Sequence, residues 1–222
     1  MLRRDLGATA KVLGAINAVV KRYYDSDSNF THGEFTINDF SYVMNKDGSL
    51  YRKCINDADG EYKFVRPSGC KGNIYSEYTI NNTRIKSYIL SMTVANDKFY
   101  DLYMSDKRLN VNHTVVERLD YYAFNNNHAC SRPNPDVAYN PAYLEVVTNS
   151  ANTRHGKFVN KYELYGIYVS ASDIDALLDT KSLIDPNDDE YADKHDYVVE
   201  HNRCVVLDYY RNVKNVSFEL CP

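Results

Sequence analysis

The 222-residue sequence has no tryptophan, only 9 glycines and 6 prolines, and no long apolar run. Because 44% of its residues are hydrophobic while glycine and proline are sparse, a disordered or low-complexity chain is excluded and a folded globular protein is expected. No apolar stretch approaches the roughly 18–20 residues that a membrane-spanning helix needs, so we expect no membrane partner.

Residues 1–24 open with basic side chains, as a signal peptide does. However, Asp5, Lys11 and Asn17 interrupt the apolar stretch, and its alanines, leucines and valines recur at close to the helical period. We therefore interpret this segment as an amphipathic helix of the folded protein.

The five cysteines are odd in number and include no closely spaced pair. This pattern fits neither a disulfide framework nor a zinc ribbon, and it predicts reduced thiols in a cytoplasmic protein. His128 and Cys130 are an alternative metal site, although no second pair completes it. Tyrosine, asparagine, lysine and aspartate are abundant, which is typical of AT-rich coding sequences and suggests a phage or viral source. Such a protein would act in the host cytoplasm.

The net charge of −4 argues against a protein that binds nucleic acid through a general positive field. The charge is uneven, because residues 1–149 carry 18 basic and 17 acidic side chains, whereas residues 150–222 carry 8 and 13. Contacts with phosphate must therefore come from local clusters of basic side chains.

The pattern of apolar residues predicts an α+β fold with strands and helices in alternation. Asp47-Gly48 between two alternating runs predicts a β-hairpin over 40–55, because glycine supplies the positive φ of a tight turn. The remaining expected elements are short strands within 61–90, a helix over 91–105, a strand ending at His113, a long loop over 117–142, a strand at 143–147, a helix from about 149, a helix over 170–184, a solvated acidic segment at 185–196 and a closing strand at 203–210.

Asn112 and His113 end one expected strand, and Asn152 and His155 lie on the helix that follows the next strand. Positions three apart share a helix face, so Asn152 and His155 can both face that strand. A histidine can deprotonate water, and carboxamide oxygens suit Mg²⁺ or Mn²⁺. Arg154 could neutralise a phosphate. The pattern therefore favours metal-assisted hydrolysis of a phosphodiester.

Two segments carry a resemblance to a known family. "VNH" (111–113) followed by "LEVVTNSANTRH" (144–155) resembles the HNH motif of the ββα-metal nucleases, in the branch of phage and intron homing endonucleases. "YVMNKDGSLYR" (42–52) is similar to the "YxVSNxGxVR" hairpin that often precedes the nuclease core. The similarity runs in the same order from about residue 40 to about 160.

The resemblance implies a metal-dependent endonuclease that cleaves double-stranded DNA. It implies His113 as the general base, Asn112 and Asn152 as ligands of one Mg²⁺ or Mn²⁺, and His155 as a catalytic histidine near the metal or the scissile phosphate. Arg154 and Lys157 on the same helix would bind DNA phosphates. Tyr143 stands where the family usually has asparagine, and the loop before Leu144 is longer than is typical.

The expected organisation has three parts: an N-terminal helix and β-hairpin region that resembles a DNA-binding region (1–105), an HNH nuclease core (106–165) and a C-terminal α/β appendage with a helix and a strand (166–222). An alternative is a catalytically inactive descendant of the same fold that binds DNA or protein or has a structural role. Tyr143 and the weak positive charge favour this alternative, whereas the intact His113 and Asn152 favour the enzyme.

Overall fold

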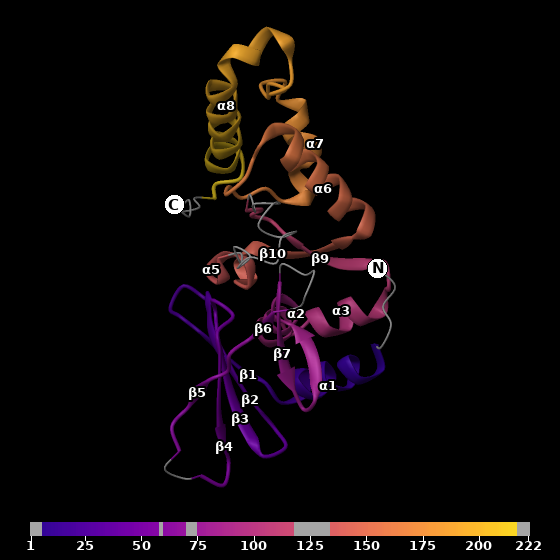
Figure 1. Cartoon of the computed structure of the whole chain (residues 1–222), viewed down its shortest axis with the longest axis vertical. Coiled ribbons are helices and arrows are strands. Elements are labelled where there is room, and N and C mark those ends of the chain that lie inside the picture. Colours follow the sequence, from indigo (N-terminus) through magenta and orange to yellow (C-terminus); the bar gives the residue numbers. More distant parts are fainter. Residues whose placement is uncertain (1–5, 58–59, 70–74, 118–133, 217–222) are drawn as a thin grey trace. The chain divides into compact units, whose positions relative to one another are not determined.

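The computed structural model describes residues 6–57, 60–69, 75–117 and 134–216, and the chain divides into two compact units (Figure 1). The N-terminal unit comprises Met1–Lys107 and Leu119–Leu144, and the C-terminal unit comprises Arg108–Arg118 and Glu145–Pro222. Helices and antiparallel sheets occur together, which confirms the predicted α+β class. None of the helices in the described ranges is long and apolar enough to cross a membrane.

The N-terminal unit contains a five-stranded sheet in the order β1-β2-β3-β4-β5, a three-stranded sheet in the order β6-β7-β8, and helices that pack on them. The elements are α1 (Leu6–Val19), β1 (Lys21–Tyr24), β2 (Phe30–Ile37), β3 (Phe40–Asn45), β4 (Leu50–Cys54), β5 (Lys63–Phe64), β6 (Ser68–Gly69), β7 (Ser76–Ile80), β8 (Thr83–Lys86), α2 (Ser87–Ala95), α3 (Phe99–Ser105), α5 (Pro135–Ala138) and the 3₁₀ turn η1 (Pro141–Tyr143).

The core of this unit lies between the sheets and helices α1 and α2. Leu13 and Ile16 of α1 are buried against Phe35 of β2 and its neighbours on the sheet. Helix α2 also packs closely on the sheet. Gly33 of β2 permits this, because a Cβ there would lie 2.3 Å from the side chain of Val94 on α2. The predicted N-terminal helix is thus confirmed over Leu6–Val19 as part of the folded core, whereas Lys21–Tyr24 of the same segment form strand β1.

The hairpin between β3 and β4 forms where Asp47-Gly48 predicted it. Gly48 has a φ of +78°, and the Asn45 amide donates to the Ser49 carbonyl at 3.0 Å. Asp47 adds a side-chain hydrogen bond by accepting from the Ser49 amide at 2.9 Å. This local signal was sufficient because the turn is closed by residues within four positions of one another.

The C-terminal unit is mainly helical around one two-stranded sheet, β9 with β10. Its elements are β9 (Leu109–His113), β10 (Leu144–Thr148, whose first residue is assigned to the other unit), α6 (Asn149–Tyr162), the 3₁₀ turn η2 (Ala171–Asp173), α7 (Ile174–Asp179), the 3₁₀ helix η3 (Asp189–Lys194), α8 (His195–Asp208) and the π-helical turn η4 (Tyr209–Val213). Phe158 and Val159 of α6 pack with Ile174 and Leu177 of α7 in its core.

The predicted closing strand at 203–210 is wrong, because these residues belong to helix α8 and the turn η4. Val198, Asn202 and Val206 are each fully buried and four residues apart, which is the spacing of one helix face. The buried Asn202 is satisfied by two hydrogen bonds to the backbone of Ile184, at 2.8 and 2.7 Å. The expected C-terminal α/β appendage is therefore helical in the part that the structure describes.

Three other expected segments differ in detail. The helix expected over 91–105 is two helices, α2 and α3, separated at Asn96, whose backbone is extended. The helix expected over 170–184 ends at Asp179, and the acidic segment 185–196, which is mostly exposed as expected, contains the 3₁₀ helix η3. Most of the loop expected over 117–142 lies outside the described residues, as do His128 and Cys130.

Candidate functional site

Strands β9 and β10 and helix α6 form a strand, strand, helix unit within the C-terminal unit (Figure 1). The Asn149 amide donates to the Arg108 carbonyl at 2.9 Å, and the Asn112 side chain bonds that of Glu145, so the end of one strand lies beside the start of the other. This is the relation of antiparallel neighbours. Helix α6 begins directly after β10 and packs against β9.

Thr148 caps α6, because its hydroxyl accepts a hydrogen bond from the Ala151 amide at 3.2 Å. The Asn149 amide is also paired, with the Arg108 carbonyl. Two of the amides at this helix N-terminus are thus occupied within the protein and are not free to bind an anion.

Asn112 is a buried side chain of β9 with a fixed orientation. It is 3% exposed, and its Nδ2 donates to Glu145 Oε1 at 2.7 Å. Because a carboxylate only accepts hydrogen bonds, the amide nitrogen must face Glu145. The Oδ1 atom of Asn112 is consequently turned away from the carboxylate.

Glu145 is the residue of this site to which the sequence assigned no role. Its carboxylate accepts from Asn112 Nδ2 at 2.7 Å, from Ser170 Oγ at 2.9 Å and from the Ala171 amide at 2.8 Å. It thereby joins β9, β10 and the start of η2. The sequence does contain a sign that Glu145 is paired. It lies inside the apolar run Leu-Glu-Val-Val, where an unpaired buried charge would cost free energy.

His155 lies in the core of the C-terminal unit. It is 1% exposed, and its Nε2 is 2.8 Å from the Val169 carbonyl oxygen, so this nitrogen carries the proton and donates. Burial lowers the pKa of His155 below its ordinary value, against the opposite effects of the Val169 carbonyl and the Glu145 carboxylate. The ring is therefore neutral at pH 7, and its catalytic role stays a prediction.

His113 and Asn152 are both half-buried, at the end of β9 and on α6 respectively. The packing of α6 against β9 brings together the two elements that carry the predicted base and ligands. The chain beyond His113 is held in the same unit, because the Val169 amide donates to the Thr114 carbonyl at 2.7 Å and the Gly166 amide donates to Val116. That the side chains of His113 and Asn152 meet at one point stays a prediction.

Arg154 and Lys157, the predicted phosphate-binding residues, are both exposed on α6. The Arg154 guanidinium makes two hydrogen bonds to the carboxylate of Asp175, which raises the pKa of Arg154 and lowers that of Asp175. The pair is in solvent, where such pairs are weak and exchange partners readily.

The predicted ligands at this site are oxygen donors. Within the described ranges, no three side chains of the His, Cys, Asp or Glu type are grouped to hold a metal ion. The ligands that the resemblance implies are carboxamide oxygens, and the hydrogen bond to Glu145 fixes the amide of Asn112 in one orientation. Thr114, two residues after Asn112, has a buried hydroxyl for which no hydrogen-bond partner is found in the described chain. Oxygen donors of this kind suit Mg²⁺ or Mn²⁺.

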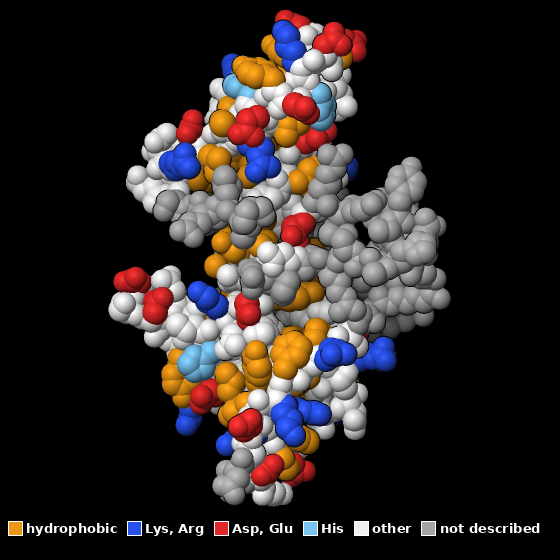
Figure 2. Space-filling view, turned by 60° about the vertical axis from the view of Figure 1, so that its left-hand side comes forward, with side chains coloured by type: hydrophobic (Ala, Val, Ile, Leu, Met, Phe, Trp, Pro, Cys, Tyr) orange, Lys and Arg blue, Asp and Glu red, His pale blue; other side chains and the backbone are white. Residues whose placement is uncertain are grey.

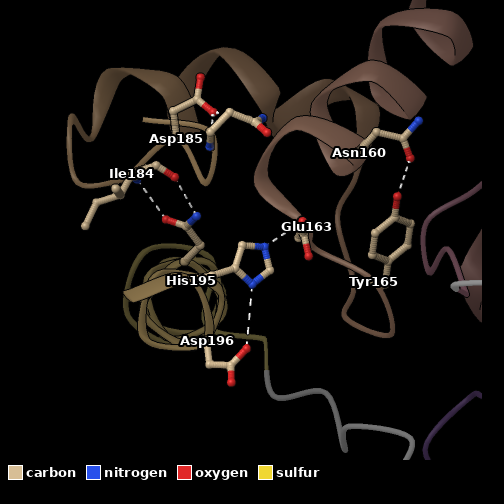
Figure 3. A network of polar contacts seen from close by, with 9 residues as sticks. Asn160, Glu163, Tyr165, Ile184, Asp185, His195 and Asp196 are labelled. Carbon is tan, nitrogen blue, oxygen red and sulfur yellow. Dashed lines mark hydrogen bonds and ion pairs between the residues drawn. The ribbon is translucent and has the colours of Figure 1, made fainter. Parts of the chain in front are cut away.

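A second polar cluster lies at the other end of α6 (Figure 3). His195, at the start of α8, places Nε2 3.0 Å from Glu163 and Nδ1 3.6 Å from Asp196. The Glu163 carboxylate, with a smaller effect of Asp196, raises the pKa of His195 above its ordinary value. This cluster joins two helices and leaves no donor set for a metal, so we interpret it as structural.

Comparisons of this chain with known protein families, with curated proteins and with solved structures find no match.

Proposed function

We propose that this chain is a metal-dependent DNA endonuclease of the HNH homing type. The observation that supports it most is the strand, strand, helix unit in which Glu145 fixes the amide of Asn112 next to the strand end that carries His113. Burying an asparagine beside a carboxylate costs free energy unless the two are hydrogen-bonded, and here that bond holds the amide in one orientation. It is what a carboxamide ligand of a cation requires.

In the proposed reaction, His113 accepts the proton of a water molecule that attacks the phosphodiester. Asn112 and Asn152 would hold one Mg²⁺ or Mn²⁺, and this ion, when bound, polarises the phosphoryl group and stabilises the leaving oxygen. Lys157, together with Arg154 released from Asp175, would bind the DNA phosphates of a double-stranded substrate. His155, buried and neutral, would support the helix on which Asn152 lies.

The alternative is a non-catalytic descendant of the same fold that binds DNA or protein. One observation favours it, namely that His155 is 1% exposed and bonded to a backbone carbonyl, as a purely structural histidine would be. The two functions differ in the role of His113. A nuclease needs that ring as a base, whereas a binding protein does not.

A plasmid assay separates them. We expect supercoiled DNA to be converted to open-circle or linear form with Mg²⁺ or Mn²⁺ and to remain intact with a chelator. His113→Ala should reduce the rate by about 10²–10⁴-fold, which is the usual contribution of a general base, with the fold retained. His201→Ala, at a half-buried histidine on α8 outside this site, is the matched control and should cleave like the wild type. No cleavage of any DNA by the wild type would favour the binding protein.

A further inference from the structure

Arg52 of β4 and Lys63 of β5 are directly opposite each other in the five-stranded sheet. Side chains in these positions point to the same face with their Cβ atoms about 4.5–5.5 Å apart, and two like charges placed so repel each other. Neither side chain forms an ion pair with a described residue. The fold thus holds two positive charges side by side with no counter-charge from the described part of the chain.

This pair lines a cavity of about 580 Å³ in the N-terminal unit, which we call the basic cavity. Arg66, which follows β5, and Thr79 of β7 line it as well. Thr79 is exposed, and its hydroxyl has no hydrogen-bond partner among the described residues. The volume is in the range of about 300–1,000 Å³ typical of sites for small molecules. Figure 2 shows Lys and Arg side chains next to hydrophobic ones on the exposed surface of this unit.

Strand alternation decides which side chains share a face with this pair. Tyr51 and Phe64 are opposite each other one position along, so their rings lie on the other face of the sheet. Lys53 is on that other face too, and its ammonium is 5.4 Å from the centre of the Tyr62 ring. Phe64 and Lys53 border the cavity, but they belong to a different face from Arg52. Positive charge is therefore the feature that the face of Arg52 offers to a ligand.

Arg52 is held in place by aromatic side chains of β3. Its guanidinium carbon is 4.9 Å from the centre of the Phe40 ring, which is within the distance of about 6 Å at which a ring attracts a cation. Tyr42 is directly opposite Arg52. Burial raises the pKa of the Tyr42 hydroxyl, and the nearby charge of Arg52 opposes this shift. Both rings are neutral at pH 7, so they position the guanidinium without cancelling its charge.

Two carboxylates, those of Asp57 and Glu61, also line the basic cavity. Neither has an oxygen within the 4.0 Å of an ion pair from a basic side chain of the described residues. Arg52, Lys63 and Arg66 therefore remain unpaired there, in a chain whose net charge is −4. Unpaired cations gathered in a cavity attract an anionic ligand.

We propose that the basic cavity binds a phosphate dianion, held by Arg52, Lys63 and Arg66. The Thr79 hydroxyl adds a hydrogen bond to it. A phosphate monoester carries about −1.5 to −2 charges at pH 7, which matches two opposed cations better than the single charge of a carboxylate. An arginine also binds phosphate through two parallel hydrogen bonds.

The dianion has two sources, free inorganic phosphate or the phosphate group of a small ester. The cavity is larger than a bare phosphate ion, which favours the ester. The inference does not rest on the endonuclease proposal, because no residue of the basic cavity belongs to the site around Asn112.

Isothermal titration calorimetry of the full chain with glycerol 3-phosphate, with inorganic phosphate and with acetate tests the proposal. We expect at least one phosphate probe to bind about tenfold more tightly than acetate, and the tighter of the two identifies the source. Lys63→Gln should weaken that binding at least about tenfold, because a hydrogen bond from a charged donor is lost. Lys11→Gln, at an exposed lysine of α1 outside the cavity, is the matched control and should bind like the wild type.

Thermal melts separate a lost charge from a damaged fold. Without phosphate, Lys63→Gln should melt at or above the temperature of the wild type, because the repulsion from Arg52 is removed. With phosphate, its melting temperature should rise less than that of the wild type. If Lys63→Gln melts lower without phosphate, Arg66→Gln gives the binding comparison instead. The proposal is overturned if neither phosphate probe binds, if acetate binds as tightly as both, or if Lys11→Gln weakens binding as much as the change in the cavity.

Discussion

Replacing Glu145 by glutamine removes one charge from the C-terminal unit and keeps the shape of the side chain nearly unchanged. Oε1 accepts from Asn112 Nδ2 and from the Ala171 amide, and Oε2 accepts from the hydroxyl of Ser170. In its best orientation, glutamine keeps its oxygen at the first two donors and places its NH₂ at Ser170, whose hydroxyl can turn to accept. All three hydrogen bonds then persist as neutral ones.

The magnitude follows from this count. A hydrogen bond to a charged group contributes about 1.5–3 kcal/mol and a neutral one about 1 kcal/mol, so weakening all three by about 0.5–2 kcal/mol each should lower the free energy of unfolding by about 1.5–6 kcal/mol. Glu200→Gln, a carboxylate that is 73% exposed on α8, is the control and should change it by less than about 0.5 kcal/mol.

Urea unfolding followed by circular dichroism measures the loss. Hydrogen exchange of the Ala171 amide gives a local measure, since this amide donates directly to Glu145 and should exchange faster in Glu145→Gln. A variant with the midpoint of the wild type and a protected Ala171 amide would refute the role of Glu145 in holding the site.

Three further changes test other parts of the structure. Asn112→Asp places a second carboxylate 2.7 Å from Glu145, so one of the two must hold a proton in the fold; thermal melts should show a loss of stability that grows from about pH 5 to about pH 8. Leu177→Ala, at a fully buried position, should cost about 2–5 kcal/mol in urea unfolding, whereas Leu178→Ala, at a position 41% exposed, should cost far less. Because the pKa of His195 is raised in the fold, its ion pair with Glu163 contributes fully to stability below the ordinary pKa of 6.5, and this contribution is lost as pH rises through the raised pKa. His195→Ala should therefore lower the melting temperature more at about pH 6 than at about pH 9.

Local signals predicted the elements that are closed by neighbouring residues. The hairpin at Gly48 and the start of α6 at Thr148 each depend on hydrogen bonds spanning at most four positions. Helix α8 was mispredicted because Cys-Val-Val-Leu has a local preference for strands. The helix is favoured because it buries Val198 and Val206 on one face. That gain depends on the chain around Ile184 and the rest of the core packing against this face.

The sequence could predict the elements on which the candidate residues lie, but not the hydrogen bonds around them. Asn112 and Asn152 could be placed on adjoining elements by their spacing from the strands. The partners of Glu145, Ser170 and Ala171, lie 25 and 26 residues further along the chain, and no local rule joins them. The burial of His155 against Val169 is likewise a tertiary contact, 14 residues apart.

The central claim is that Asn112 and Asn152 hold one divalent cation beside His113. Anomalous diffraction from crystals soaked in Mn²⁺ tests this most directly. The account predicts a single peak with the Oδ1 atoms of Asn112 and Asn152 at about 2.0–2.2 Å and the ring of His113 nearby without being a ligand. A soaked crystal with no peak between β9 and α6, or with Mn²⁺ bound only elsewhere on the chain, would contradict it.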